Sequence, residues 1–258
     1  MESRRYIVIT PCRNEEKNLP NLIESMAEQT IKPVLWVIVD DGSTDHTPEI
    51  IKKAKEKHKW IQSIRLKGNK RDLGLHYASA WNKGFVFAIE YCVKNGIAYH
   101  YLGSIDGDII LEPTFFENLI KEFERDPDLG IASGGIKRII GSRVVYSKGR
   151  RDEPSGGNML IRRKCFEECG ISISYSPDSV LNVKARLRGW KTKRFEENMA
   201  TEIRDVFSAS GYWNGYFQFG KSAYYRNFNP LHVIVKSILY LLKKPYYIGI
   251  AYSINLNL

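Results

Sequence analysis

The chain has 258 residues, of which 43% are hydrophobic and 26% are charged, and its formal net charge is +10. This composition is that of a globular protein with a sizeable core, and it excludes disordered and collagen-like chains. The charge is uneven: Lys and Arg number 18 against 20 acids up to Gly130, but 21 against 9 from Ile131 onward. The basic second half is either a solvated surface or a face that meets an anionic partner, namely a phosphorylated substrate, a membrane or nucleic acid.

Strand and helix patterns alternate through the first half of the chain. Apolar, β-branched runs predict strands at 6–10, 34–39, 61–66 and 98–105. Helical patterns follow them at 18–30, 47–59, 75–95 and 113–124. Thr47 is expected as the N-cap of the second helix, with Pro48 at its first position. The alternation predicts parallel strands joined by right-handed crossovers, with helices on both faces of the sheet.

The second half is less regular. Strand patterns occur at 130–135, 142–147 and 158–163, and a short amphipathic helix is expected at 179–189. No repeat, low-complexity tract or clear linker interrupts the chain. We therefore expect one domain over residues 1–229 and an accessory helical region over 230–258.

Cysteine usage and the N-terminal pattern predict a cytoplasmic protein. The four cysteines occur without secretory features, which favours reduced thiols. The apolar run at 6–9 is too short for the core of a signal peptide. Cys165 and Cys169 lack further ligands at zinc-site spacing, so we interpret them as small apolar residues.

Acidic residues follow three of the predicted strands. Glu15 comes after the first, Asp40 and Asp41 after the second, and Asp106 and Asp108 after the fourth. Sheets of this kind bind ligands beyond the carboxyl ends of their strands, so these side chains should converge on one crevice. Clustered carboxylates repel one another unless a cation or hydrogen-bond donors offset their charge. The oxygen ligands of the Asp-Gly-Asp turn suit Mg²⁺ or Mn²⁺.

Asp41 has two interpretations. As a structural residue, it forms a turn by accepting hydrogen bonds from backbone N–H groups near Ser43 and Thr44. As a functional residue, its carboxylate accepts hydrogen bonds from the N–H edge of a nucleobase. The first explains a single aspartate, whereas the second also explains why acids gather on several loops.

Four segments then show a family resemblance. TPCRNEEKNL, VIVDDGSTDHT, ASAWNKGF and GSIDGDIILEP come in the order and spacing of inverting family-2 glycosyltransferases of GT-A fold. The chain resembles this family densely in its first half and more loosely to about Asn229. The resemblance implies an α/β fold with a Rossmann-like, mostly parallel twisted sheet. Within it, residues 1–110 would form the nucleotide-binding half and 111–229 the acceptor half.

The resemblance also implies a metal-dependent hexosyltransferase-like enzyme and a set of site residues. Its cofactor would be Mn²⁺ or Mg²⁺, and its donor a UDP-, GDP- or dTDP-linked sugar. The base would be held by Pro11, Arg13, Glu15 and Asp41, with Arg13 standing where many relatives carry tyrosine. The ribose contact would come from Asp106 and the diphosphate contact from Arg71. The metal would be held by Asp108 and Glu202, with Asp106 also near the metal. Ordinary surface roles remain alternatives for Arg71, a solvated arginine, and Glu202, an ion pair.

The acceptor side is implied by two further segments. Gly156 and Gly157 resemble the segment that lies beneath the substrates, and Asp178 aligns with the general base of the family. Pro177 stands where relatives usually carry glutamate. The alternative for Asp178 is an N-cap of the helix that begins near Ser179. The implied reaction is a single displacement with inversion, unlike the two-step retaining scheme.

The apolar stretch 231–242 is too short to span a membrane. It either packs on the protein or lies in a membrane interface. The second alternative would make the enzyme peripheral on the inner membrane face. It would also suit a lipid-linked glycan as the acceptor, whereas a soluble glycan needs no membrane contact.

Two other functions compete with the transferase. A sugar-phosphate nucleotidyltransferase would carry a glycine-rich loop after the first strand, and the segment 10–19 contains no glycine. A non-enzymatic binder of an anionic polymer would leave the acidic crevice unexplained. Nucleic acid is not an expected partner, because no nucleic-acid motif is present.

Overall fold

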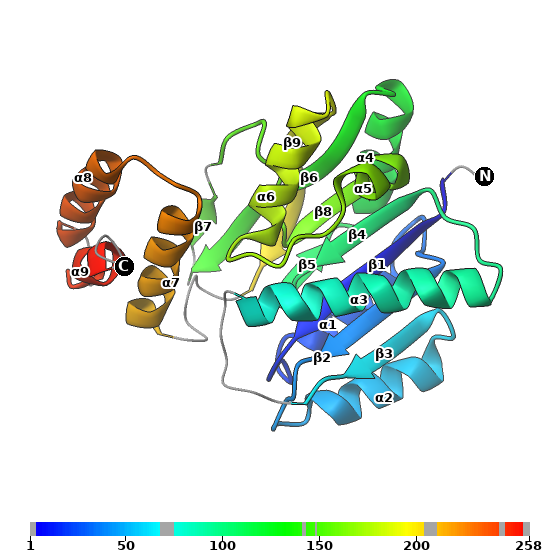
Figure 1. The fold of residues 1–258 in the computed structure, drawn as a ribbon. Coiled ribbons are helices and arrows are strands. Elements are labelled where there is room, and N and C mark those ends of the chain that lie inside the picture. Colours follow the sequence, from blue (N-terminus) through cyan, green and yellow to red (C-terminus); the bar gives the residue numbers. More distant parts are fainter. Residues whose placement is uncertain are drawn as a thin grey trace.

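A nine-stranded sheet forms the centre of the protein (Figure 1). The structure is a computed structural model that describes residues 4–67, 75–140, 143–147, 149–203, 211–242 and 246–254. The strand order is β3-β2-β1-β4-β8-β6-β9-β5, and β7 pairs with β6. The mixed α/β architecture confirms the predicted fold class.

The first half of the chain builds the parallel part of the sheet. Its strands are β1 (Tyr6–Cys12), β2 (Leu35–Asp40), β3 (Ile61–Arg65) and β4 (Tyr101–Ile105). The β1–β2, β1–β4 and β2–β3 pairs are all parallel. Its helices are α1 (Leu19–Ala27), α2 (Thr47–Lys57) and α3 (Leu75–Lys94). The sequence periodicity predicts each of these strands and helices, with small differences at the ends.

The second half completes the sheet with mixed pairing. Its strands are β5 (Ile109–Leu111), β6 (Leu129–Ile140), β7 (Arg143–Tyr146), β8 (Asn158–Arg162) and β9 (Lys191–Glu202). Its helices are α4 (Phe115–Arg125), α5 (Arg163–Cys169) and α6 (Pro177–Leu187). The pair β6–β9 is parallel, whereas β8 runs antiparallel to β4 and β6. The sequence patterns do not predict β5, β9 or α5.

Helices cover both faces of the sheet. One apolar core joins α1, α2 and α4 to side chains of the strands such as Trp36 and Ile38. The other joins α3, α5 and α6 to the alternate side chains, such as Val37 and Val39. Gly84 lets α3 lie close to the sheet, because a Cβ there would be only 2.8 Å from a methyl group of Val39.

The start of α2 differs from the prediction. The helix begins at Thr47 with His46 as its N-cap residue, so Thr47 is not the cap. Thr47 is buried, and its hydroxyl accepts a hydrogen bond from the backbone N–H of Glu15 at 2.8 Å. The hydroxyl therefore ties the loop after β1 to α2, instead of satisfying the first N–H groups of its own helix.

Three helices follow β9 and lie to one side of the sheet (Figure 1). They are α7 (Tyr212–Tyr225), α8 (Pro230–Leu241) and α9 (Ile248–Ser253). A small core of Ala223, Val233 and Tyr252 joins them. Within the described residues, none of the helices combines the length and apolar character needed to cross a bilayer.

Candidate active site

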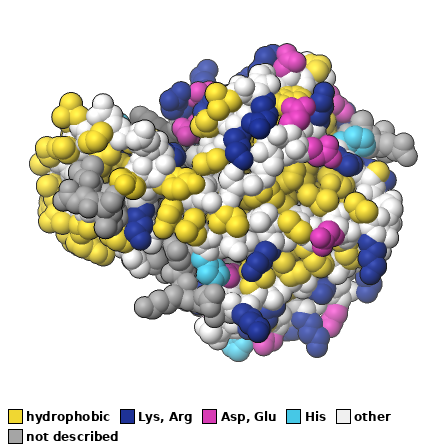
Figure 2. Space-filling view, viewed as in Figure 1, with side chains coloured by type: hydrophobic (Ala, Val, Ile, Leu, Met, Phe, Trp, Pro, Cys, Tyr) yellow, Lys and Arg dark blue, Asp and Glu magenta, His cyan; other side chains and the backbone are white. Residues whose placement is uncertain are grey.

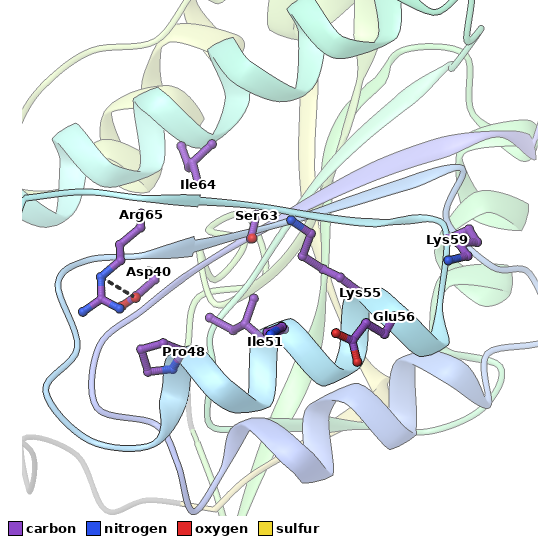
Figure 3. A pocket seen from close by; sticks show the side chains of 10 residues that line it. Asp40, Pro48, Ile51, Lys55, Glu56, Lys59, Ser63, Ile64 and Arg65 are labelled. Carbon is purple, nitrogen blue, oxygen red and sulfur yellow. Dashed lines mark ion pairs between the residues drawn. The ribbon is translucent and has the colours of Figure 1, made fainter.

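The two aspartates at the end of β2 have different neighbours. Asp40 is only 3% exposed, and its Oδ1 accepts a hydrogen bond from the N–H of Ser43 at 2.8 Å. Its Oδ2 lies 3.4 Å from Nε of Arg65, beside a cavity of about 360 Å³ between α2 and β3 (Figure 3). Asp41 follows with its Oδ2 3.1 Å from Nδ1 of His76, which belongs to α3 on the opposite face of the sheet. Asp40 thus supports the turn, whereas Asp41 faces the α3 side.

Asp41 presents a buried acceptor. Its side chain is 13% exposed, and its Oδ1 has no hydrogen-bond partner among the residues that the structure describes. Burial raises the pKa of Asp41, while the neighbouring His76 and Arg13 lower it. An unpaired buried carboxylate oxygen is costly, so Oδ1 is a strong candidate to accept a hydrogen bond from a ligand.

The loop after β1 lies between Asp41 and the Asp-Gly-Asp turn. Pro11 is buried in β1, in register with Val39 of β2. The backbone carbonyl of the next residue, Cys12, accepts the N–H of Asp41 at 2.9 Å. Glu15 is 6% exposed and packs against Gly107, where a Cβ would lie 3.1 Å from its Cγ. The structure therefore brings Pro11 and Glu15 to the same edge as both acidic loops.

Asp106 and Asp108 form the turn between β4 and β5. The N–H of Asp106 donates to the carbonyl of Gly157 at 3.0 Å, and its Oδ1 accepts the hydroxyl hydrogen of Tyr77 at 3.0 Å. Burial and the negative charge of Asp108 raise the pKa of Asp106 to about 7, and more weakly so do Glu202 and Asp178. These acids are thus close enough to repel one another.

Glu202 reaches the turn from β9. It is the last residue of that strand and lies opposite Ile109 in the β5–β9 ladder. Its Oε2 accepts a hydrogen bond from Nε of Arg138 at 2.5 Å. The ion-pair alternative for Glu202 is therefore present in the structure, and the same carboxylate also lies near Asp106.

Two glycines separate Asp106 from Asp178. A Cβ on Gly157 would lie 2.5 Å from Oδ2 of Asp106, and a Cβ on Gly156 would lie 2.8 Å from Oδ2 of Asp178. Any larger residue at either position would displace a carboxylate. The segment at 156–157 therefore places these two acids on neighbouring sides of one backbone stretch.

Asp178 occupies the first turn of α6 and is not its cap. The helix begins at Pro177, and the cap position is Ser176, so the N-cap alternative for Asp178 is wrong. Burial raises the pKa of Asp178, while hydrogen bonds from the backbone N–H groups of Ser179 and Gly156 lower it. The raised pKa is suited to a group that exchanges a proton.

The donor set fits a hard divalent cation. Carboxylate oxygens from one tight turn are the ligands that Mg²⁺ and Mn²⁺ prefer. In the absence of a cation, burial and the charge of Asp108 make the ionised form of Asp106 unfavourable. No cluster of three or more His, Cys, Asp or Glu side chains is arranged to hold a metal within the described parts of the chain. A cation would therefore need further oxygen ligands, such as those of a diphosphate.

His76 and Tyr77 are contacts that the sequence patterns do not predict. Both lie in the first turn of α3, and the helical pattern there gives no sign that they contact the acidic residues. Their closeness in sequence to Arg71, in the segment before the helix, is the signal that could have indicated them, because ligands bind at that edge of the sheet. Arg71 itself lies outside the described residues.

The fold and this edge define an α/β protein with acidic side chains gathered beyond the carboxyl ends of its parallel strands. Comparison with known sequences gives its family. The sequence model described as Glycosyl transferase family 2 matches residues 7–183, and the chain belongs to that family.

Its relatives include a poly-beta-1,6-N-acetyl-D-glucosamine synthase of Staphylococcus aureus, which is 27% identical over 141 residues. That match covers 53% of this chain but only 29% of the relative, so the chain spans less than a third of that protein.

Two solved structures share the fold. A mannosyltransferase of Pyrobaculum calidifontis in complex with GDP-Man and Mn²⁺ is 16% identical, with a TM-score of 0.63 over 97% of this chain and 69% of that one. S. aureus TarS 1-349 in complex with UDP-GlcNAc is also 16% identical, with a TM-score of 0.59 over 85% of this chain and 66% of that one. The chain therefore has the fold of GT-A glycosyltransferases.

Proposed function

We propose that the protein is a metal-dependent inverting glycosyltransferase that moves a sugar from a nucleotide-diphosphate donor to an acceptor hydroxyl. The observation that carries this proposal is the arrangement around Gly156 and Gly157, which sets Asp106 of the Asp-Gly-Asp turn beside Asp178 of α6. One acid on the donor side and one potential base on the acceptor side are what a single displacement requires.

The nucleotide lies across the loops after β1 and β2. The unpaired Oδ1 of Asp41 accepts a hydrogen bond from the base, since uracil, thymine and guanine all present ring N–H groups. Pro11, Arg13 and Glu15 border the base, Asp106 contacts the ribose, and Arg71 contacts the diphosphate. UDP-, GDP- and dTDP-linked sugars all fit this scheme, and structures with this fold hold UDP-GlcNAc or GDP-Man.

The metal is Mn²⁺ or Mg²⁺, held by Asp108 together with Asp106. When bound, it offsets the charge that develops on the leaving diphosphate. Glu202 is a further ligand once Arg138 shares its carboxylate with the cation. The raised pKa of Asp106 supports this assignment, because a cation would relieve the repulsion that raises it.

Asp178 is the general base. Its carboxylate is held by the N–H groups of Ser179 and Gly156, and it accepts the proton of the acceptor hydroxyl. The acceptor oxygen then attacks the anomeric carbon from the face opposite the leaving group, and the configuration is inverted in one step. Tyr77 orients Asp106 by donating its hydroxyl hydrogen to Oδ1 of that carboxylate.

The acceptor is a glycan or a lipid-linked glycan, and the reaction takes place in the cytoplasm or at the inner face of the membrane. The relative from S. aureus is a synthase of a glucosamine polymer, which supports a glycan acceptor. Exposed apolar residues on α8, such as Leu231 and Ile238, support a peripheral membrane contact.

Calorimetric titration of UDP, GDP and dTDP with and without Mn²⁺ tests the donor side. One nucleotide should bind, and more tightly with Mn²⁺. The variant Asp178→Asn should keep that binding and lose sugar transfer, whereas a non-enzymatic polymer binder would be unaffected by the change. Release of pyrophosphate from a nucleoside triphosphate and a sugar 1-phosphate would indicate a nucleotidyltransferase and contradict the proposal.

A further inference from the structure

A large cleft lies between α6 and the C-terminal helices. It consists of a cavity of about 760 Å³ that reaches Tyr77 and Asp178, and a cavity of about 680 Å³ that continues toward Phe228. Both cavities are lined by Arg150, Glu153, Ser179, Arg226 and Lys236. We call the two together the α6–α8 cleft.

The cleft carries positive charge that its own acids neutralise only in part. Arg226 follows α7, and its Nη1 lies 3.9 Å from Glu153, at the limit of an ion pair. The other acid of the cleft is Asp178, whose pKa is raised by burial but lowered by the charge of Arg226. Lys236 of α8 is half-buried, its pKa is lowered by burial and by Arg226, and no carboxylate among the described residues forms an ion pair with it. The space beside Lys236 therefore favours an anionic ligand.

Arg150 does not add to this excess, because its guanidinium is held by Asp152 through two hydrogen bonds of 3.0 and 2.8 Å. Arg226 is positioned by weaker contacts, which include 3.4 Å from its Nη1 to the hydroxyl of Ser179 and a stacking distance of 4.6 Å over Phe228. These contacts fix the guanidinium near the first turn of α6 and leave its charge available to a ligand.

The wall of the cleft also offers polar and apolar contacts. Oε1 of Gln218 is buried and has no hydrogen-bond partner among the described residues, so it can accept a hydroxyl hydrogen. Val180, Val183 and Phe228 give the smaller cavity an apolar side. Figure 2 shows apolar side chains gathered over this end of the molecule. The wall therefore suits an amphiphilic ligand.

We propose that the α6–α8 cleft binds an acceptor that carries a phosphate group, with Arg226 and Lys236 contacting the phosphate while a hydroxyl of the acceptor lies at Asp178. This inference rests on the proposed function and adds the acceptor class. Both cations lie beyond residues 7–183, so the family match does not supply them.

The chemistry of the step balances within the proposed reaction. The acceptor oxygen forms a bond to the anomeric carbon, and the bond from that carbon to the diphosphate oxygen breaks. The hydroxyl proton passes to Asp178, and the nucleoside diphosphate leaves with the electron pair. The acceptor phosphate takes no part in bond making, and it places the hydroxyl through its two cationic contacts.

Two sources of such a phosphate can be separated by binding measurements on the full chain. The soluble probe is glucose 6-phosphate, with glucose as its reference. The lipid probe is a glucosyl isoprenyl monophosphate in detergent, whose sugar supplies the acceptor hydroxyl, with the matching isoprenyl glucoside as its reference. At least one phosphate probe should bind about ten times more tightly than its reference, and added salt should weaken this binding. A preference confined to the lipid probe would assign the lipid source, and one confined to glucose 6-phosphate the soluble source.

Variants test whether residues of the cleft cause the preference for the phosphate probe. Lys236→Gln and Arg226→Gln should each lower the affinity for the phosphate probe about tenfold. Lys236→Arg should retain most of that affinity. Lys94→Gln is the matched control, because it removes the same charge from the exposed end of α3. Nucleotide binding with Mn²⁺ should be unchanged in every variant, and its loss from the wild type would count against the proposed function alone. Equal binding of probes and references, or unchanged binding in the double variant, would overturn the inference.

Discussion

Replacing Asp106 by asparagine should stabilise the metal-free protein above neutral pH. Burial and the charge of Asp108 raise the pKa of Asp106 from 3.8 to about 7, so the folded state binds this proton more tightly than the unfolded chain does. A difference of this size corresponds to about 4 kcal/mol against the ionised folded form. Because the repulsion is shared with Asp108, Glu202 and Asp178, we expect a measured gain of about 2 to 4 kcal/mol.

The direction of the pH dependence follows from the linkage between proton binding and folding. A carboxyl group with a raised folded pKa contributes stability that is fully present below about pH 4 and is lost as the pH rises through about 7. The asparagine side chain of the variant carries no charge at any pH, and its amide oxygen can still accept the hydroxyl hydrogen of Tyr77. The gain of Asp106→Asn should therefore be large at about pH 8 and close to zero at about pH 4.

Urea unfolding at the two pH values, in the presence of a chelator, measures this difference. Asp45→Asn is the control of opposite sign. Burial alone would raise the pKa of Asp45, but hydrogen bonds donated by the side chain and backbone N–H of Thr47 help to lower it below its usual value, so the same change should destabilise the protein at about pH 8. Saturating Mn²⁺ together with the nucleoside diphosphate should make the wild type more stable than Asp106→Asn, because only the wild type offers the Asp106 carboxylate to the cation. An Asp106→Asn variant that is no more stable than wild type at this higher pH without metal would refute the reasoning.

Three further changes probe the site and its support. Asp41→Asn should weaken nucleotide binding about tenfold in calorimetry, because the amide loses the charge that strengthens the hydrogen bond from the base; unchanged affinity would contradict the role of Asp41. Gly157→Ala should cost about 1 to 3 kcal/mol in urea unfolding and abolish transfer, since its Cβ would lie 2.5 Å from Asp106; Ser155→Ala, two residues earlier, is the control for transfer. Trp81→Phe should cost about 1 to 3 kcal/mol, because Ser104 would lose its 2.8 Å hydrogen bond in the core, and a loss under about 0.5 kcal/mol would contradict this.

The first half of the fold could be predicted because its signals are local. Strands β1 and β2 are buried along their whole length, so they appear as continuous apolar runs, and α4 has a regular apolar stripe. Strand β9 could not be found in this way, since it alternates exposed lysines with buried residues and owes its place to pairing with β6 over long sequence distance. Strand β5 has only three residues, too few to show a period.

The acidic side of the site was predictable for a related reason. Carboxylates at strand ends stand out in the sequence, and the topology of parallel strands brings them together. The contacts from Tyr77, Arg226 and Lys236 come from helices whose surface pattern is ordinary, and they gain meaning only from how α3, α7 and α8 are placed. Sequence patterns carry no signal for that placement.

The two sides of the site carry opposite electrostatic costs. Burial raises the pKa of Asp41 and Asp106, so the edge where we propose that the donor binds holds carboxylates that are unfavourable as anions. Burial and Arg226 lower the pKa of Lys236, so the α6–α8 cleft holds an ammonium group that is unfavourable in its charged form. A ligand that brings a divalent cation and N–H groups to the first side, and phosphate to the second, relieves both costs at once. The phosphate-bearing acceptor that we propose would give part of the basic excess in the second half of the sequence a role in binding.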